Sequence, residues 1–344
     1  MNKKNISIGS LLIGNEAPPI TIAEAAVEHL GSVKVAMRMA DAAKEIGADC
    51  IKFQMHLPEI EMISNVIKFW GGSLDEILEK YNLSTNDHKI LIDYCKEIGI
   101  EYLCTPFCPD AVDILDELGV NGYKTGSGEM MNLPMMERIA KTGKPVIIST
   151  GMSTMTELEE TVIFLKKIDL EFMITNCTSI YPAPYEAINL GLIPLYKEKF
   201  DILVGHSDHT PDIWTSLGAV ALGANVIEKH FTLNRFMRGP DYQVSLEPEE
   251  FKIMVQAIKK IYAAGGINKE LHKDEVKVRD WAHHSVVAIK DIPENTVLTK
   301  DMIGVKRPGT GIPAKHIHDL MEYKTLKSVK KDTILQWDKL KKTI

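Results

Sequence analysis

The stretch ILVGHSDHTPDIWTSLGAVALGANVIEKHF (residues 202–231) decides the fold. Two short apolar runs enclose a segment with a helical pattern that ends at a glycine, which predicts a strand, a helix and a second strand. Such a crossover returns the chain to the same edge of a sheet, so His209 and His230 should lie on neighbouring strands at one mouth. Two neutral imidazoles can hold a divalent metal ion. A general acid–base pair and hydrogen-bonded structural histidines are the alternatives, and His206 is less favoured as a ligand.

The same unit recurs through the first 230 residues. Apolar runs without alternation suit strands buried on both faces, and helical patterns separate most of them. This order predicts parallel βαβ units and a (β/α)8 TIM barrel over residues 1–265, with FKIMVQAIKKIYAAGG as its last helix. The eight predicted strands are PITIAE, ADCIKFQ, IEYLCTP, NGYKTGS, KPVIIST, EFMITNC, DILVGHS and ANVIEKH.

The pattern changes after the barrel. Residues 266–284 are charged without clear periodicity and are predicted to form a linker. Residues 285–344 contain short strand-like runs and many turn signals, which indicate a small β-rich domain. A core of that size is marginal alone, so we expect the domain to pack against something.

Composition excludes several classes of function. The 344 residues are 45% hydrophobic and 25% charged, with a net charge of −7, which argues against nucleic acid or an anionic membrane as the main partner. No apolar run reaches the length of a membrane span, and the N-terminal residues do not read as a signal peptide. The five cysteines are odd in number and lack CxxC spacing, so we expect reduced, buried thiols and a cytoplasmic location.

Polar residues follow the predicted strands, and in a TIM barrel those ends carry the chemistry. Lys52 and Lys124 each lie inside an apolar strand, where a charge is costly unless it is paired. Each could be salt-bridged inside the barrel, but two at one mouth favour a phosphate or carboxylate ligand, and Ser127 and Gly128 add backbone N–H groups. The strand-end residues are Glu24, Lys52, Gln54, Thr105, Lys124, Ser127, Glu129, Ser149, Thr150, Asn176, Thr178, Ser207, Asp208, His209, Glu228 and His230.

These residues belong to a series of motifs that resembles the sialic acid synthases, in the same order along the chain. The series is IAEAAVEHLGS, ADCIKFQMH, YLCTPF, YKTGSGE, PVIISTGMS, NCTSIYP, GHSDHT, IEKHF, GPD and VKRPGTG. The resemblance implies condensation of phosphoenolpyruvate with an open-chain N-acetylated amino sugar, such as N-acetylmannosamine. The product is a nine-carbon 2-keto acid, and phosphate leaves by C–O cleavage. It also implies that the C-terminal domain is an antifreeze-like (SAF) module.

The resemblance further implies roles for individual residues. His209 and His230 would hold a divalent metal, manganese or magnesium, and Glu24 or Glu129 would act as general base. Family enzymes form dimers in which the SAF module of one chain covers the other chain's barrel and delivers an arginine that matches Arg307. The implied phosphoenolpyruvate ligands are Lys52, Thr105, Lys124, Ser127, Ser179 and Ser207. The implied sugar ligands are Glu24, Gln54, Tyr181, Asp241 and Arg307.

The chain departs from the family pattern at Glu28, where relatives carry Asn, and at Asn176 and Ser179. The GPD motif at 239–241 favours N-acetylneuraminic or legionaminic acid over pseudaminic acid as the product. The alternatives for substrate are 2,4-diacetamido-2,4,6-trideoxymannose and N-acetylmannosamine 6-phosphate. A non-catalytic sugar- or anion-binding barrel is the alternative of a different class.

Overall fold

The computed structural model describes residues 5–66, 68–69 and 72–343. The first four residues lie outside the described part; they belong to the N-terminal segment that the sequence analysis tested for a signal peptide. The chain divides into two compact units, Met1–Gly266 and Ile267–Ile344. Within the described residues, no helix combines the length and the apolarity needed to cross a bilayer.

The first unit is built on an eight-stranded parallel sheet with hydrogen-bonded order β7-β4-β3-β12-β11-β10-β9-β8. Its end strands β7 and β8 lie next to each other, so the sheet is a nearly closed barrel, and the prediction of a TIM barrel is confirmed. Each of the eight predicted runs forms one strand. The strands are β3 (Ile20–Ala26), β4 (Cys50–Met55), β7 (Glu101–Pro106), β8 (Tyr123–Thr125), β9 (Val146–Ser149), β10 (Phe172–Cys177), β11 (Val204–Asp208) and β12 (Val226–His230).

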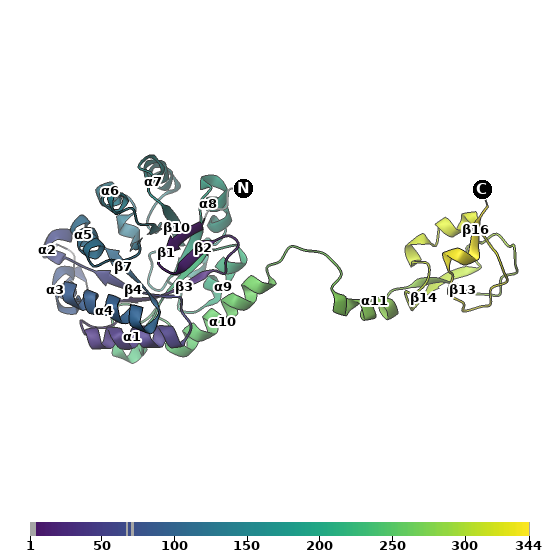
Figure 1. The fold of residues 1–344 in the computed structure, drawn as a ribbon, viewed down its shortest axis with the longest axis horizontal. Coiled ribbons are helices and arrows are strands. Elements are labelled where there is room, and N and C mark those ends of the chain that lie inside the picture. The colour runs from purple at the N-terminus through teal and green to yellow at the C-terminus, as the bar shows by residue number, and fades with distance from the viewer. Residues whose placement is uncertain (1–4, 67, 70–71, 344) are drawn as a thin grey trace. The chain divides into compact units, whose positions relative to one another are not determined.

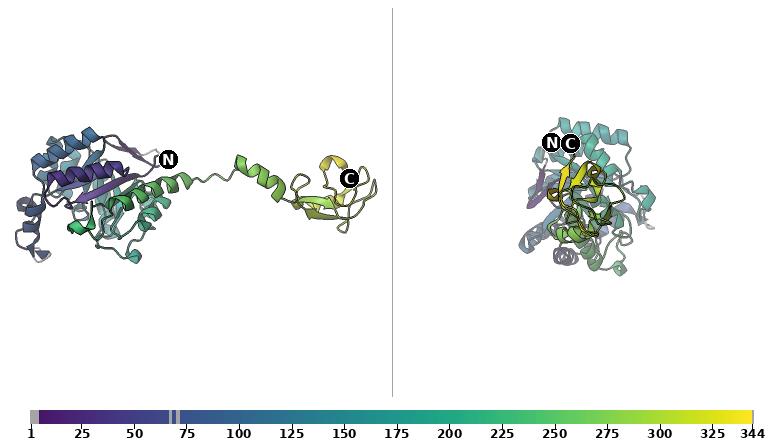
Figure 2. Two further views of the ribbon diagram at one scale, coloured as in Figure 1. Left: turned by 90° about the horizontal axis from the view of Figure 1, so that it is seen from below. Right: turned by 90° about the vertical axis from the view of Figure 1, so that its right-hand side faces the viewer.

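Helices surround these strands (Figure 1, Figure 2). Local signals define their ends: the Thr154 side chain accepts from Glu157 N at the start of α7, and Gly99 and Gly143 end α4 and α6 in the left-handed conformation that glycine adopts without strain. The helices are α1 (Val33–Glu45), α4 (Thr85–Ile98), α5 (Pro109–Glu117), α6 (Leu133–Thr142), α7 (Met155–Lys167), α8 (Leu192–Phe200), α9 (Trp214–Ala221) and α10 (Pro248–Ala264).

The loop after β4 carries its own short elements, α2 (Pro58–Glu61), β5 (Lys68–Phe69), β6 (Gly72–Ser73) and α3 (Leu74–Tyr81). An N-terminal hairpin, β1 (Asn5–Ile8) and β2 (Leu11–Gly14), was not predicted. Its Ile6, Ile8 and Ile13 pack with Ile22, Leu103 and other apolar residues from the first halves of the barrel strands. The hairpin therefore closes the end of the barrel opposite the strand C-termini, which leaves the other end for chemistry.

The second unit has its own apolar core, which includes Val286, Ile303, Ile312 and Leu335. Its strands form two antiparallel pairs, β13 (Ser285–Ala288) with β14 (Ile303–Lys306) and β15 (Tyr323–Thr325) with β16 (Leu340–Lys342). The segment predicted as an irregular linker contains helix α11 (Val276–Ala282). Its few apolar residues are mostly exposed, so they gave no periodic signal.

Candidate active site

A hollow lies at the C-terminal ends of the barrel strands. Eleven of the predicted site residues line it, and they come from β3, β4, β7, β8, β11, β12 and the loops that follow the strands. These are Glu24, Lys52, Gln54, Thr105, Lys124, Ser127, Tyr181, Ser207, His209, His230 and Asp241. Phe107, Gly126, Ser149, Cys177 and Glu228 complete the lining.

Both buried lysines are paired with carboxylates inside the hollow. Lys52 Nζ lies 2.8 Å from Glu24 Oε2 and 3.1 Å from Glu228 Oε1, and it donates to Thr105 Oγ1 at 2.8 Å. Lys124 Nζ lies 3.2 Å from Glu228 Oε2 and also donates to the Ser149 hydroxyl. Glu228 therefore connects the two ammonium groups and fixes the distance between them.

The electrostatics of the two carboxyl groups differ. Burial alone would raise the pKa of Glu228, but Lys124 and Lys52 hold it below its usual range, so Glu228 stays ionised. Burial raises the pKa of Glu24 despite the opposing effect of Lys52. Although burial alone would lower the pKa of Lys52, Glu24 and Glu228 raise it above its usual value. The Lys52 cation is thus retained in a site from which water is largely excluded.

His209 and His230 lie side by side at the mouth, with ring centroids 5.3 Å apart. His209 Nδ1 donates to the Thr178 carbonyl at 2.7 Å, which leaves Nε2 facing the hydroxyl of Tyr181 at 3.0 Å. Burial, and then His209, lower the pKa of His230 well below its usual range, so its ring is neutral. The buried His230 Nδ1 has no hydrogen-bond partner.

These observations fit a divalent metal ion. A backbone carbonyl fixes the ring orientation of His209, as is usual for ligating histidines. The nitrogen of His230 that has no hydrogen-bond partner can offer its lone pair to a metal ion. Within the described part of the chain, no group of three or more His, Cys, Asp and Glu side chains gathers as ligands. An ion held by this pair would therefore keep positions open for water and substrate.

A buried ion pair lies behind the histidines, on the face of the sheet that the helices cover. Asp208 and Lys229 are register partners on β11 and β12, are 0% exposed, and approach to 3.3 Å. Asp208 also accepts from the Thr210 amide and hydroxyl, both at 2.8 Å, and from hydroxyls of Thr215 and Ser216 in α9. Because the pair joins the residues that precede His209 and His230, it holds the two imidazoles in register.

Hydroxyl groups gather where the loops after β8, β9 and β10 meet. Ser127 Oγ accepts from Gly151 N at 3.1 Å. A Cβ at Gly151 would meet Ser179 Oγ at 2.3 Å and Ser127 Oγ at 2.6 Å, so both hydroxyls lie against this glycine. Ser179 is therefore next to Ser127 although it is not part of the lining. The requirement for glycine at position 151 comes from this close approach.

Glu28 holds the loop that contains Asp241. It is fully buried, it accepts from Asp241 N at 2.8 Å, and its carboxylate lies where a Cβ at Gly239 would be. Asp241 in turn presents Oδ2 at 3.7 Å from His230 Nδ1. Burial, then Glu28 and Glu24, raise the pKa of Asp241 to about 7. Glu28, one of the residues at which this chain departs from the family pattern, therefore lies outside the lining and affects the site by holding Asp241.

Three predicted residues lie outside the lining: Ser179, Glu129 and Arg307. Glu129 is in the turn after β8, where its Oε2 occupies the space of a Cβ at Gly126 and burial raises its pKa to about 7. Arg307 belongs to the second unit, where its guanidinium lies over the Trp281 ring at 5.4 Å. Among the described residues, no carboxylate pairs with Arg307.

The sequence interpretation placed Glu228 and Ser149 at strand ends without assigning them a ligand or catalytic role, and it gave no role in the site to Cys177 or Phe107. Strand parity supports the placement of Glu228, since residues two apart point to the same face of a strand, and His230 lies two positions later. Cys177 lies 3.9 Å from His209 Nδ1, where burial alone would raise the pKa of its thiol, but His209 lowers it to about 7. The other four cysteines are free and buried, as predicted.

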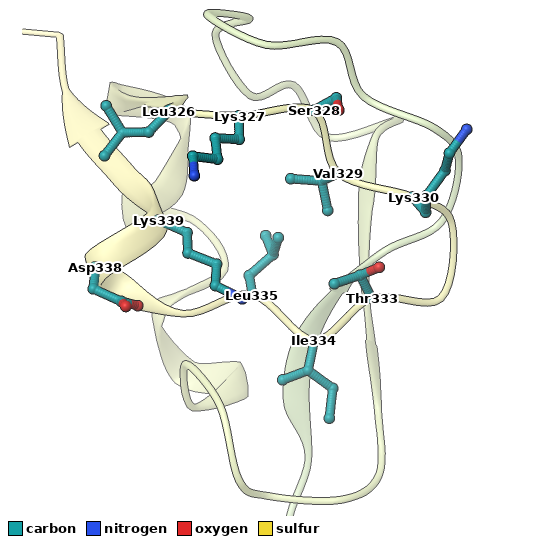
Figure 3. A pocket seen from close by; sticks show the side chains of 10 residues that line it. All are labelled: Leu326, Lys327, Ser328, Val329, Lys330, Thr333, Ile334, Leu335, Asp338 and Lys339. Atoms are coloured by element: carbon teal, nitrogen blue, oxygen red, sulfur yellow. The ribbon is translucent and has the colours of Figure 1, made fainter.

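The second unit contains a separate hollow of about 470 Å³ (Figure 3). Its lining combines Leu326, Val329 and Leu335 with lysine side chains. Lys327 points into the hollow, whereas Lys330 points away from it and pairs with Asp291 at 2.9 Å (Figure 3). The lining has no histidine or cysteine, which makes the barrel mouth the better candidate for catalysis.

Comparison with known proteins places this geometry in a family. Residues 39–270 match the NeuB family model and residues 283–341 match the SAF domain model. The N,N'-diacetyllegionaminic acid synthase of Campylobacter jejuni is 38% identical over 92% of this chain and 98% of its own length. The human N-acetylneuraminate-9-phosphate synthase is 36% identical over 94% of this chain and 93% of its own length. The crystal structure of an N-acetylneuraminic acid synthetase from Leptospira borgpetersenii superposes with a TM-score of 0.74 at 31% identity, covering 80% of this chain and 95% of that one.

Proposed function

Since the chain belongs to the NeuB family and is an enzyme of the sialic acid synthase type, we propose that it condenses phosphoenolpyruvate with an open-chain N-acetylated amino sugar. The sugar is N-acetylmannosamine or a close relative, and the products are a nine-carbon 2-keto sugar acid and phosphate. The observation that carries this proposal is the meeting of two buried lysines and two histidines in one hollow. Such a site suits an anionic and a carbonyl substrate held together.

The lysine side of the hollow would bind phosphoenolpyruvate. Lys52 and Lys124 supply cations that Glu228 holds in place, while Thr105 and Ser207 supply hydroxyl groups beside them. Ser127 and Ser179, packed against Gly151, would bind the remaining oxygens of the phosphate or carboxylate. Such an arrangement orients the enol so that its C3 faces the histidine side of the mouth.

The histidine side would bind the sugar carbonyl. Manganese or magnesium held by His209 and His230 would supply Lewis acidity to the carbonyl oxygen. C3 of phosphoenolpyruvate then attacks the aldehyde carbon, water adds to C2, and phosphate leaves by cleavage of its C–O bond. We assign the general base for the water to Glu24, because it lines the hollow, whereas Glu129 does not.

The sugar ligands are Gln54, Tyr181 and Asp241, together with an arginine delivered from a second protomer. Lys52 and Lys124 are the only lysines in the described lining, which contains no arginine, and both are assigned to phosphoenolpyruvate. The lining thus favours an uncharged sugar over a sugar phosphate. The 2,4-diacetamido-2,4,6-trideoxymannose used by legionaminic acid synthases is the second candidate, favoured by the 38% identity to such an enzyme.

The quaternary arrangement is part of the proposal. Arg307 is exposed and its guanidinium has no carboxylate partner among the described residues, so it is free to bind the N-acetyl group of the sugar. We propose a domain-swapped homodimer in which the SAF module of each protomer brings Arg307 to the barrel mouth of the other. The free thiols support a cytoplasmic location.

A phosphate-release screen tests the function directly. The purified full chain is incubated with phosphoenolpyruvate, manganese and a panel of amino sugars that includes N-acetylmannosamine, its 6-phosphate and the diacetamido sugar. Release should require metal, phosphoenolpyruvate and a sugar together, and the uncharged sugars should support it best. Full activity after EDTA treatment would contradict the metal assignment, and release without any sugar would contradict the condensation.

A further inference from the structure

A chain of hydrogen bonds runs from the loop after β4 into the hollow. Glu61 of α2 faces His56, His56 faces Gln54, and Gln54 donates to Glu24. The distances are 2.8 Å from Glu61 Oε1 to His56 Nδ1, 3.1 Å from His56 Nε2 to Gln54 Oε1, and 2.8 Å from Gln54 Nε2 to Glu24 Oε1. The side chains of His56 and Glu61 are only 6% and 4% exposed.

The chemistry of the groups sets the direction of each bond. Gln54 Nε2 lies 2.8 Å from Glu24 Oε1, so the amide NH₂ of Gln54 donates to this carboxyl group, which is also paired with Lys52. Gln54 Oε1 then faces His56 and accepts a proton from Nε2. The other ring nitrogen faces the Glu61 carboxylate, which also only accepts. Each ring nitrogen of His56 therefore faces an oxygen to which it can donate, Oε1 of Gln54 or Oε1 of Glu61.

The surroundings hold this ring in place. His56 stacks on Phe107, with centroids 4.0 Å apart and an interplanar angle of 16°. Its backbone is bonded in both directions to the side chain of Asn82, at the end of α3. Glu61 Oε2 also accepts from Leu57 N at 2.9 Å. Neither the ring nor its carboxylate partner can turn away without breaking several buried contacts.

We propose that His56, held by Glu61, is a positioning residue that fixes the amide of Gln54 as a hydrogen-bond donor to the amino sugar. One N–H of Gln54 is used by Glu24, and the second remains for the substrate. Gln54 therefore selects an oxygen acceptor, a hydroxyl or an N-acetyl carbonyl, and disfavours an ammonium group at that place. This inference rests on the proposed function for the identity of the ligand only.

Substitutions at position 56 distinguish the contributions of the two ring nitrogens. His56→Gln places an amide NH₂ near the position of Nε2, so it can still donate to Gln54. His56→Asn reaches only the position of Nδ1, and His56→Phe keeps the stacking on Phe107 while removing both donors. We expect KM for the sugar to rise about 10- to 100-fold in His56→Phe and His56→Asn, the range of one lost charge-assisted hydrogen bond. KM for phosphoenolpyruvate should stay within about twofold of wild type in all three variants, and His56→Gln should keep a sugar KM within about threefold.

His56→Phe leaves the Glu61 charge unpaired, so His56→Phe with Glu61→Gln provides a second variant in case the first does not fold. A wild-type sugar KM in both Phe variants overturns the proposal. An equal rise of KM for the sugar and KM for phosphoenolpyruvate also overturns it. A lower sugar KM in His56→Asn than in His56→Gln does so as well.

A second measurement does not depend on turnover. In the ¹⁵N spectrum of histidine-labelled protein, with the signal assigned by its loss in His56→Gln, both ring nitrogens of His56 should carry protons. A neutral His56 in that spectrum overturns the proposal even if the enzyme is active. A wild-type protein that releases no phosphate with any sugar contradicts the proposed function instead, while the spectrum still decides the hydrogen-bond chain.

Discussion

Asp208→Asn should destabilise the barrel by about 3–5 kcal/mol, because it removes one partner of a fully buried ion pair. Lys229 would then face the oxygens of Thr210 and the amide oxygen of the new side chain, which carry no charge to compensate that of the ammonium group. Lys229→Met should cost less, about 1–3 kcal/mol, since the Asp208 carboxylate keeps four donors from Thr210, Thr215 and Ser216. The double variant should lose less than the sum of the two single losses.

The loss should depend on pH. Burial alone would raise the pKa of Asp208, but Lys229 and the surrounding donors hold it below its usual value. A depressed carboxyl pKa contributes stability above the unfolded-state pKa, and this stability is lost as the pH falls through the folded-state value. The difference in free energy of unfolding between wild type and Asp208→Asn should therefore become smaller at acidic pH. Burial lowers the pKa of Lys229, so the variant should recover stability as the pH rises and this lysine loses its proton.

Urea unfolding followed by tryptophan fluorescence measures these differences. Trp281 and Trp337 of the second unit, and also Trp70, are replaced by Phe in every protein compared, so that the remaining tryptophan, Trp214, next to Thr215, reports on the barrel. Asp93→Asn is the matched control, because the Lys89–Asp93 pair is 61% and 67% exposed and its loss should cost less than about 1 kcal/mol. The reasoning is refuted if Asp208→Asn destabilises the barrel no more than Asp93→Asn does.

Three further predictions concern the mouth. His209→Ala and His230→Ala should each abolish phosphate release and weaken manganese binding at least about 100-fold by titration calorimetry, and unchanged binding would exclude them as ligands. Arg307→Lys should raise KM for the sugar about tenfold through loss of the planar fork, with KM for phosphoenolpyruvate unaltered; a wild-type sugar KM would argue against delivery of Arg307 to the site. Glu28→Leu leaves the Asp241 amide unsatisfied and should cost about 1–3 kcal/mol in thermal unfolding while raising the sugar KM, whereas Glu28→Gln keeps an acceptor and should behave like wild type. Equal thermal stability and equal sugar KM in the two Glu28 variants would show that Glu28 does not hold Asp241 in place.

The barrel was predictable because its signals are local. Buried parallel strands read as apolar runs, and helix ends carry cap residues and glycines, so each βα unit can be recognised without knowledge of its neighbours. Strand parity extends this to side chains: Ser207 and His209 line the hollow, whereas His206 and Asp208, which alternate with them, do not. The N-terminal hairpin was missed because its short apolar runs have a partner only once the barrel exists to receive them.

The sequence by itself determined which strand ends carry polar groups, since alternation and chain order are properties of the sequence alone. Only the tertiary structure decided which of these groups meet. It placed Glu228 between Lys52 and Lys124, Glu28 beneath Asp241, and His56 against Gln54. These contacts join β12, β8, β4 and the loop at 239–241, and whether two such groups come within bonding distance depends on how the strands and their loops converge at the mouth. Charge balance and hydrogen-bond direction follow from those distances, and no local pattern of residues encodes them.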